Sequence, residues 1–302
     1  VMDLSNGDVV DYLERVVGAV LDSASIAYVK WDMNRYITEP YGASLPPERQ
    51  NEFFHRYMLG VYDLYARLTE RFPEILFESC AGGGGRLDPG MLAFAPQAWT
   101  SDNTDAVERQ RIQYGASLVY PLSSLGAHVS AVPNHQVGRV TSIDTRAAVA
   151  FFGSLGYELD PRGLDEVERE RVANQIAWYK ERRELFQQGR LHRLVSPFEG
   201  DGNETAWMLV DADRERSVVG WYRTLAHAMP GPSLLPLRGL DPDARYRVTL
   251  WPEADDWVAR ATVMERGGDD LRQVGLFLDD HAIESQARGD FQSRLFELER
   301  IG

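Results

Sequence analysis

The feature that most constrains the fold is the alternation of short apolar runs with long amphipathic segments over residues 1 to about 190. Runs at 26–32, 75–80 and 98–102 have the length and apolar character of buried strands. Between the first two runs, apolar side chains recur at steps of four and three residues from Phe54 to Phe72, which predicts an amphipathic helix. Strands that alternate with helices in this way are typical of βα units around a parallel sheet.

The remaining elements of this region continue the alternation. Helices are predicted after Ser5, from about 104, and over 164–188, where Gly189 is placed to end the helix. Two more strands are predicted at 117–120 and 148–153. About five strands result, whereas eight close a (β/α)8 barrel. We therefore expect an α/β fold in which residues 1–190 form a partial (β/α)8, TIM-type barrel.

From residue 191 onward the pattern changes to short strand-like runs broken by Pro, Gly and Asp. Strands are predicted at 206–210, 217–222 and 246–250. We expect residues 191–302 to form a C-terminal antiparallel β-sandwich domain without a catalytic role. Trp257 is interpreted as a packing residue, with sugar binding as the alternative.

Charge and cysteine content limit the partners. Lys and Arg number 32 against 46 Asp and Glu, a formal net charge of −14, which disfavours nucleic acid and anionic membrane as partners. No apolar run approaches the roughly 20 residues of a membrane span. Cys80 is the single cysteine, so no internal disulfide forms. A cysteine count of one fits either a cytosolic or a secreted protein. The first residues lack the pattern of a signal peptide, and we expect a cytoplasmic protein.

Several strands end on polar side chains, where barrels carry their catalytic groups. Asp32 lies between Lys30 and Arg35, and neighbouring cations favour an ionised carboxylate that can act as a nucleophile. The alternative is that Asp32 caps a turn and pairs with Arg35. Asp105 fits a helix cap, whereas Asp102, three residues earlier, lies where it could face the same cleft as Asp32. Two carboxylates from different strands are what a glycosidase needs.

The glycine run 82–85 and two histidines carry weaker signals. The run lacks the helix context of a dinucleotide loop and the Lys of a phosphate loop, which leaves a flexible linker or a loop that contacts sugar hydroxyls. His128 and His135 match no zinc spacing, and we expect no metal site.

Taken together, four segments resemble glycoside hydrolase family 36, the retaining α-galactosidases: 28–35 (YVKWDMNR), 77–91 (FESCAGGGGRLDPGM), 99–105 (WTSDNTD) and 126–139 (GAHVSAVPNHQVGR). The resemblance implies a double displacement in which Asp32 is the nucleophile and Asp102 the acid/base. It also implies that the galactose subsite is formed by four further residues: Lys30 and Asn34, which would bind hydroxyls, and Cys80 and Gly82, which would line the subsite. This chemistry requires no cofactor.

The resemblance further implies substrates of the raffinose and melibiose type and a homotetramer in the full-length protein. Members of the family are longer, so we expect this chain to be a C-terminal part that begins at the end of the third barrel strand and holds strands four to eight. On its own, such a part is expected to be poorly stable and inactive. The alternatives are an α-N-acetylgalactosaminidase of the same family, a transglycosylating relative of the raffinose-synthase kind, and an inactive carbohydrate-binding or structural fragment.

Overall fold

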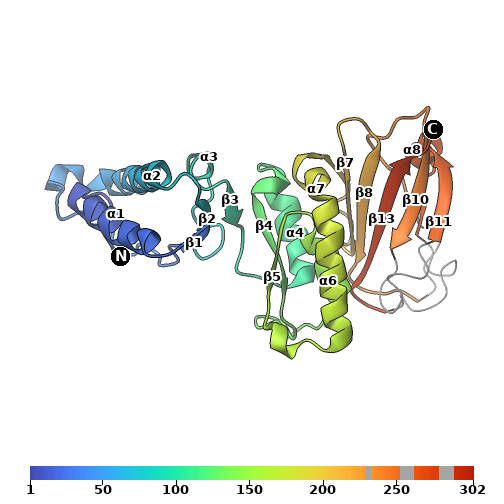
Figure 1. The fold of residues 1–302 in the computed structure, drawn as a ribbon, viewed down its shortest axis with the longest axis horizontal. Helices are drawn as coiled ribbons and strands as arrows, with labels where there is room; N and C mark the ends of the chain where they lie inside the picture. The colour runs from blue at the N-terminus through green and yellow to red at the C-terminus, as the bar shows by residue number, and fades with distance from the viewer. Residues whose placement is uncertain (229–232, 252–261, 279–288) are drawn as a thin grey trace. The chain divides into compact units, whose positions relative to one another are not determined.

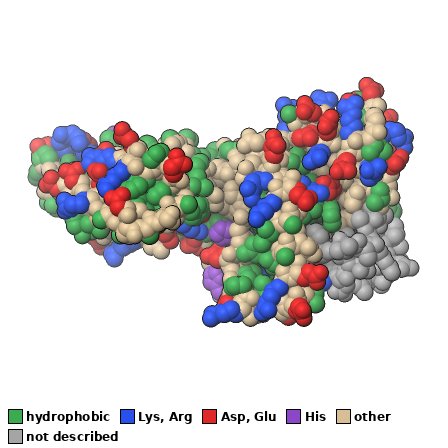
Figure 2. Space-filling view, viewed as in Figure 1, with side chains coloured by type: hydrophobic (Ala, Val, Ile, Leu, Met, Phe, Trp, Pro, Cys, Tyr) green, Lys and Arg blue, Asp and Glu red, His purple; other side chains and the backbone are tan. Residues whose placement is uncertain are grey.

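A computed structural model describes residues 1–228, 233–251, 262–278 and 289–302, which divide into two compact units, 1–102 and 103–302 (Figure 1). Trp257 lies outside the described residues. On the face seen in Figure 2, acidic and basic side chains lie interspersed over both units. None of the helices in the described ranges combines the length and apolar character needed to cross a bilayer.

The first unit is a three-stranded parallel sheet with helices. Its elements are α1 (Gly7–Asp22), β1 (Tyr28–Asp32), the 3-10 helix η1 (Pro47–Glu52), α2 (Phe53–Arg71), β2 (Leu76–Cys80), α3 (Pro89–Leu92) and β3 (Gln97–Trp99). Strand β2 pairs with β1 on one side and with β3 on the other, both parallel. The predicted strands at 26–32 and 75–80 and the helix ending near Phe72 are confirmed, with boundaries shifted by a residue or two.

One face of this sheet packs on α2. Tyr65 of α2 is fully buried, and its ring stacks on Trp31 at 4.7 Å and meets Phe77 edge-on at 6.0 Å. Because successive strand residues point to opposite faces, this packing assigns Val29, Trp31 and Phe77 to the apolar face. The alternate residues of β1, including Lys30 and Asp32, therefore face away from α2.

The second unit combines a parallel pair of strands, a group of helices and an antiparallel sheet. Its first part holds α4 (Ala106–Ala116), η2 (Leu122–Ser124), β4 (Leu125–Ser130), α5 (Ile143–Ala150), β5 (Ser154–Glu158), η3 (Pro161–Gly163), α6 (Glu166–Glu181) and α7 (Arg183–Gln188). Strands β4 and β5 pair in parallel. With the three strands of the first unit this makes five parallel strands in the described residues. The number is the one expected, but β4 and β5 were not predicted as strands.

The antiparallel sheet has six strands in the order β11 (Thr262–Gly267), β10 (Arg245–Trp251), β13 (Gln292–Arg300), β8 (Arg216–Arg223), β7 (Glu204–Val210) and β6 (Arg190–Val195). A short antiparallel pair, β9 (Leu234–Leu235) and β12 (Leu276–Phe277), and the helix α8 (Gly268–Gln273) accompany it. The helices α6 and α7 lie beside this sheet (Figure 1). The helix α5 is bonded to it, because the Tyr222 hydroxyl of β8 donates to the Ala148 carbonyl at 2.8 Å. The predicted strands at 206–210, 217–222 and 246–250 are confirmed, and the domain boundary at 190/191 stays a prediction.

Two predicted strands were wrong. Residues 117–120 follow α4 as a turn that bonds back to it, and Leu118 and Val119 are 63% and 73% exposed. Residues 148–150 are the end of α5, in which all eight residues are buried, and residues 151–153 form the turn between α5 and β5. A helix that is buried all round has no polar face, so its apolar run cannot be distinguished from a buried strand by periodicity.

Candidate active site

A row of polar side chains crosses the face of the first sheet that points away from α2. Parallel register places Lys30 opposite Glu78 and Glu78 opposite Gln97. Two residues further along β1 and β2, it places Asp32 opposite Cys80. Register partners in a parallel sheet share a face. The carboxyl ends of β1 and β2 therefore present Asp32 and Cys80 side by side, with the Lys30–Glu78–Gln97 row beneath them.

The Asp32 carboxylate is exposed and is held by groups around it. Oδ1 accepts a hydrogen bond from the Gly82 amide and Oδ2 one from the Asn34 amide, each at 3.3 Å. In the described part of the chain no ion pair joins Asp32 to Arg35, so the cap-and-pair alternative finds no support there. Asp32 thus projects from the strand end with both oxygens oriented.

The glycine run forms a tight turn and is not a flexible linker. The Ala81 amide donates to the Gly83 carbonyl and the Gly84 amide to the Thr100 carbonyl, both at 3.0 Å. Gly82 and Gly83 have φ of 60° and 81°, which favours glycine. This turn connects the end of β1 with the segment that follows β3.

Asp102 lies on that segment, three residues beyond β3, and the glycine turn packs against it. A Cβ on Gly83 would lie 2.7 Å from the Ser101 Cα and 2.9 Å from the Asp102 amide nitrogen. One residue earlier in the same turn, Gly82 donates to Asp32. Both acids are therefore in contact with one short turn, Asp32 through its carboxylate and Asp102 through its backbone. The Asp102 carboxylate is exposed and has no hydrogen-bond partner among residues that the structure describes.

Asp105 has a different role from Asp102. Its carboxylate is buried, caps α4 by accepting from the Glu108 amide at 3.0 Å, and binds the Arg139 guanidinium. The helix-cap interpretation of Asp105 is confirmed. The two acids of this motif differ because Asp105 is engaged by its own helix and Asp102 is not.

A buried carboxylate that the sequence motifs did not single out lies under the site. Glu78 is 1% exposed, its Oε1 is 3.4 Å from the Lys30 ammonium, and its Oε2 accepts from Gln97 at 3.1 Å and from the Tyr28 hydroxyl. Burial, and then the hydrogen bond and charge of Glu78, raise the pKa of Tyr28. The sequence held one signal for this cluster: Tyr28 and Lys30, the partners of Glu78, alternate with Asp32 along one strand.

Two further contacts describe the surroundings of Lys30 and Cys80. The Lys30 ammonium lies 4.7 Å from the centre of the Trp99 ring, within the range of a cation–π contact. Burial raises the pKa of the Cys80 thiol; the Asp32 charge adds to this, and a backbone hydrogen bond with Gly83 opposes it. Cys80 is consequently a neutral thiol at pH 7, a small and weakly polar wall for a ligand.

The same unit has a hollow of about 340 Å³ next to Asn34 and the glycine turn. Exposed Tyr36 and Phe54 and buried Tyr57 contribute to its wall, and Arg86 closes one side. In the ranges that the structure describes, no cluster of three or more His, Cys, Asp or Glu is arranged to hold a metal ion. His128, on β4, instead lies 2.9 Å from Glu158 through its Nδ1.

Comparison with known proteins agrees with these features. Residues 1–189 match the Melibiase family, and residues 204–298 match the glycosyl hydrolase family 36 C-terminal domain. The whole chain is 51% identical to α-galactosidase AgaA of Geobacillus stearothermophilus and 44% identical to an α-galactosidase of Lactobacillus acidophilus, and it spans 38% of the length of each.

Solved structures give the same relationship. A crystal structure of the Geobacillus enzyme in complex with raffinose superposes with a TM-score of 0.89 over 99% of this chain and 39% of that one. The α-galactosidase of Lactobacillus brevis superposes with a TM-score of 0.90 at 45% identity, again over 99% of this chain and 39% of the other. Five parallel strands followed by an antiparallel sheet thus match these glycoside hydrolase family 36 structures. The chain belongs to the Melibiase family and carries the C-terminal domain of glycosyl hydrolase family 36.

Proposed function

We propose that the protein acts as a retaining α-galactosidase that hydrolyses terminal α-galactosyl groups of raffinose- and melibiose-type oligosaccharides. The observation that carries the proposal is the glycine turn, which binds Asp32 through the Gly82 amide and packs against the backbone of Asp102 through Gly83. This arrangement brings two acids from separate strand ends to one small loop, and a glycosidase needs two carboxyl groups that flank the bond it cleaves. The 51% identity to a named α-galactosidase supports the choice of substrate.

In the proposed reaction, Asp32 attacks the anomeric carbon while Asp102 gives its proton to the departing glycosidic oxygen. A covalent galactosyl–enzyme forms, and Asp102 then takes a proton from a water molecule that displaces Asp32 and releases α-galactose. The Gly82 and Asn34 amides orient the Asp32 oxygens for the first step.

The spacing of substituted positions in a relative supports these two assignments. Two crystal structures of the Geobacillus enzyme each carry one aspartate substitution, one in complex with raffinose and the other with stachyose. The two substituted positions lie 70 residues apart, and so do Asp32 and Asp102.

The remaining residues of the proposed subsite surround Asp32. Lys30 and Asn34 bind galactose hydroxyls, and Cys80 and Gly82 form the wall against the ring. Glu78 orients Lys30, because a buried carboxylate 3.4 Å from an ammonium restricts where that ammonium can lie. No cofactor takes part in this chemistry.

We also propose that the five parallel strands belong to a (β/α)8 barrel and that the antiparallel sheet is one layer of a β-sandwich. A homotetramer and a cytoplasmic location are likewise proposed; the free, buried Cys80 is compatible with a reducing compartment. Light scattering and cell fractionation test these two properties.

The function is tested in the protein as its gene encodes it, with p-nitrophenyl α-galactoside as substrate. Asp32→Ala and Asp102→Ala should each lower kcat by about 10³-fold or more, since each removes a group that forms or breaks a bond. Asp63→Ala is the matched control, because Asp63 is an exposed helix carboxylate whose only described partner is Arg67. Its activity should be unchanged.

Added azide separates the two roles. Azide entering the place of Asp32 in Asp32→Ala should yield β-galactosyl azide, whereas in Asp102→Ala it should intercept the covalent intermediate and yield α-galactosyl azide. The proposal fails if both variants keep wild-type turnover, or if the two azide products are exchanged. An α-N-acetylgalactosaminidase would instead prefer the N-acetylated aryl substrate by its kcat/KM.

A further inference from the structure

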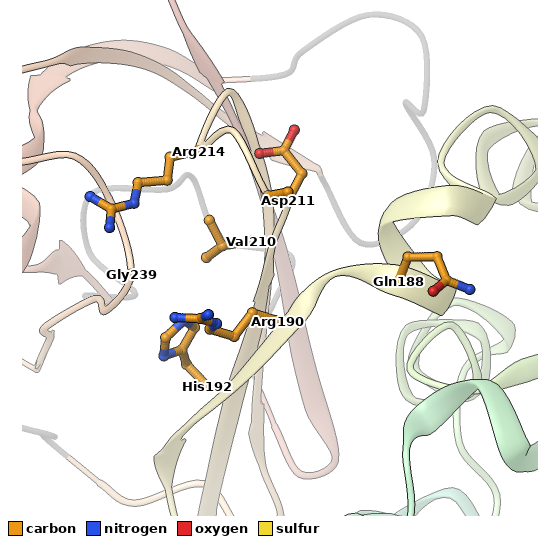
Figure 3. Close-up of a pocket in the computed structure, with 8 residues that line it drawn as sticks. Gln188, Arg190, His192, Val210, Asp211, Arg214 and Gly239 are labelled. Carbon is orange, nitrogen blue, oxygen red and sulfur yellow. The ribbon is translucent and has the colours of Figure 1, made fainter.

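A pocket of about 450 Å³ lies in the second unit, where the edge strand β6 meets the turn between β7 and β8 and the loop that holds Gly239 (Figure 3). Arg190 and His192 alternate on β6, so they share a face, and His192 pairs in register with Met208 on β7. The pocket volume falls within the range of about 300–1,000 Å³ that is usual for small-molecule sites.

Two arginines of this pocket form no ion pair within the described residues. Arg190 and Arg214 line it, and among the described residues neither pairs with a carboxylate, in contrast to Arg182 and Arg223 in the same unit. Figure 3 shows the guanidinium groups of Arg190 and Arg214 directed toward the Gly239 loop. Unpaired guanidinium groups that converge on a hollow are suited to bind an oxyanion.

The only acidic side chain in the lining is committed elsewhere. The two carboxylate oxygens of Asp211 accept hydrogen bonds from the Glu215 amide at 2.8 Å and the Arg216 amide at 3.0 Å, which fixes the turn between β7 and β8. In Figure 3 that carboxylate lies apart from the two guanidinium groups. Asp211 therefore forms no ion pair with Arg190 or Arg214, although its charge lowers the net charge of the lining.

His192 adds a neutral donor to the pocket. Its Nε2 is buried without a hydrogen-bond partner in the described part of the chain, and a Cβ on Gly239, where φ is 82°, would lie 2.4 Å from that atom. Burial, and then the charges of Arg190 and Arg238, lower the pKa of His192, so the imidazole is neutral at pH 7. A buried acceptor without a partner is tolerated better than a buried donor, which favours the tautomer with the proton on Nδ1.

We propose that this pocket binds a small molecule through a doubly charged oxyanion group, a phosphate ester or a dicarboxylate, held by Arg190, Arg214 and the imidazole of His192. Each of the two guanidinium groups can donate to an anionic oxygen, which a neutral sugar does not supply. A water molecule takes up about 30 Å³ in the liquid, and the pocket of about 450 Å³ is many times larger. The pocket therefore has room for more of the ligand than its phosphate group. The proposal does not depend on the α-galactosidase assignment.

Isothermal titration calorimetry on the protein as its gene encodes it, at low ionic strength, tests the site. The probes are inorganic phosphate, glucose 6-phosphate and succinate, with glycerol as a neutral comparison. We expect saturable binding of at least one anion with a Kd at or below about 1 mM, and none of glycerol. Preference for the two phosphates assigns a phosphate ligand, and preference for succinate assigns a dicarboxylate.

Variants locate the binding. Arg190→Gln combined with Arg214→Gln should weaken the best anion by about tenfold or more, since it removes both charge-assisted bonds. Arg272→Gln removes the same kind of exposed charge from α8, outside the pocket, and should leave the Kd unchanged. If the double variant unfolds at a lower temperature than wild type, the Kd of the single variant Arg190→Gln tests the site instead. The proposal is overturned if no anion saturates by about 10 mM, or if the pocket variants bind as tightly as Arg272→Gln.

Discussion

Replacing Gly83 with alanine tests whether the glycine turn positions Asp102. The added methyl carbon would lie 2.7 Å from the Ser101 Cα and 2.9 Å from the Asp102 amide nitrogen. Optimal contacts between such atoms begin near 3.5 Å, so the segment holding Asp102 must move by roughly 0.8 Å. A misplacement of about 1 Å can lower a rate by about 10²-fold, and we expect kcat/KM to fall by about 10- to 100-fold.

The backbone strain of this substitution needs its own control. Gly83 has φ of 81°, and alanine in the left-handed region costs about 1–2 kcal/mol of unfolding free energy. Gly200 has φ of 61°, yet nothing lies within 4 Å of a Cβ built there. Gly200→Ala should therefore lose a similar unfolding free energy in urea titrations while its kcat/KM for p-nitrophenyl α-galactoside stays unchanged. The reasoning is refuted if Gly83→Ala keeps kcat/KM within about twofold of wild type while it loses the same stability.

Three other outcomes follow from the same unit and its neighbour. Glu78→Gln should raise KM by about tenfold with a smaller change in kcat, because it removes the charge that orients Lys30 and not a reacting group; an unchanged KM would contradict this role. Cys80 should react with iodoacetamide at pH 8 at least about tenfold more slowly in the folded protein than in urea, since burial raises the pKa of its thiol and fewer thiolates are present; equal rates by peptide mapping would contradict this. Asp105→Ala should lower the free energy of unfolding by about 1–3 kcal/mol, because it removes a helix cap and leaves Arg139 without its partner, a loss that urea titration would reveal.

The sequence predicts elements well where one face is exposed. The helix that ends near Phe72 and the strand that ends at Asp32 both show a clear period, because each has a polar face and an apolar face. The failure at 148–153 has the opposite cause: α5 is buried on all sides, and its apolar run carries no period. Length was the remaining signal, and an eight-residue helix is as short as a strand.

The sequence predicts residues of the candidate site but not the contacts between them. Asp105 followed from capping preferences, whereas the proposed roles of Asp32 and Asp102 rest on the family resemblance. Glu78 was not found, because its importance depends on parallel register with Lys30 and Gln97, and register joins residues that are distant in the sequence. The turn formed by Gly82 also needed coordinates, since glycine permits many conformations.

The energies involved indicate which part of the fold positions Asp32. Its hydrogen bonds with Gly82 and Asn34 are 3.3 Å long, beyond the usual range of 2.7–3.2 Å, and an ordinary hydrogen bond contributes only about 1 kcal/mol. The opposite face of the same sheet buries Tyr65 completely against Trp31, and burial of a large side chain contributes about 1.5–3 kcal/mol. Trp31 is the residue next to Asp32 on β1. The direction of the carboxylate is therefore set chiefly by apolar packing one residue away, and the two hydrogen bonds refine the orientation of its oxygens.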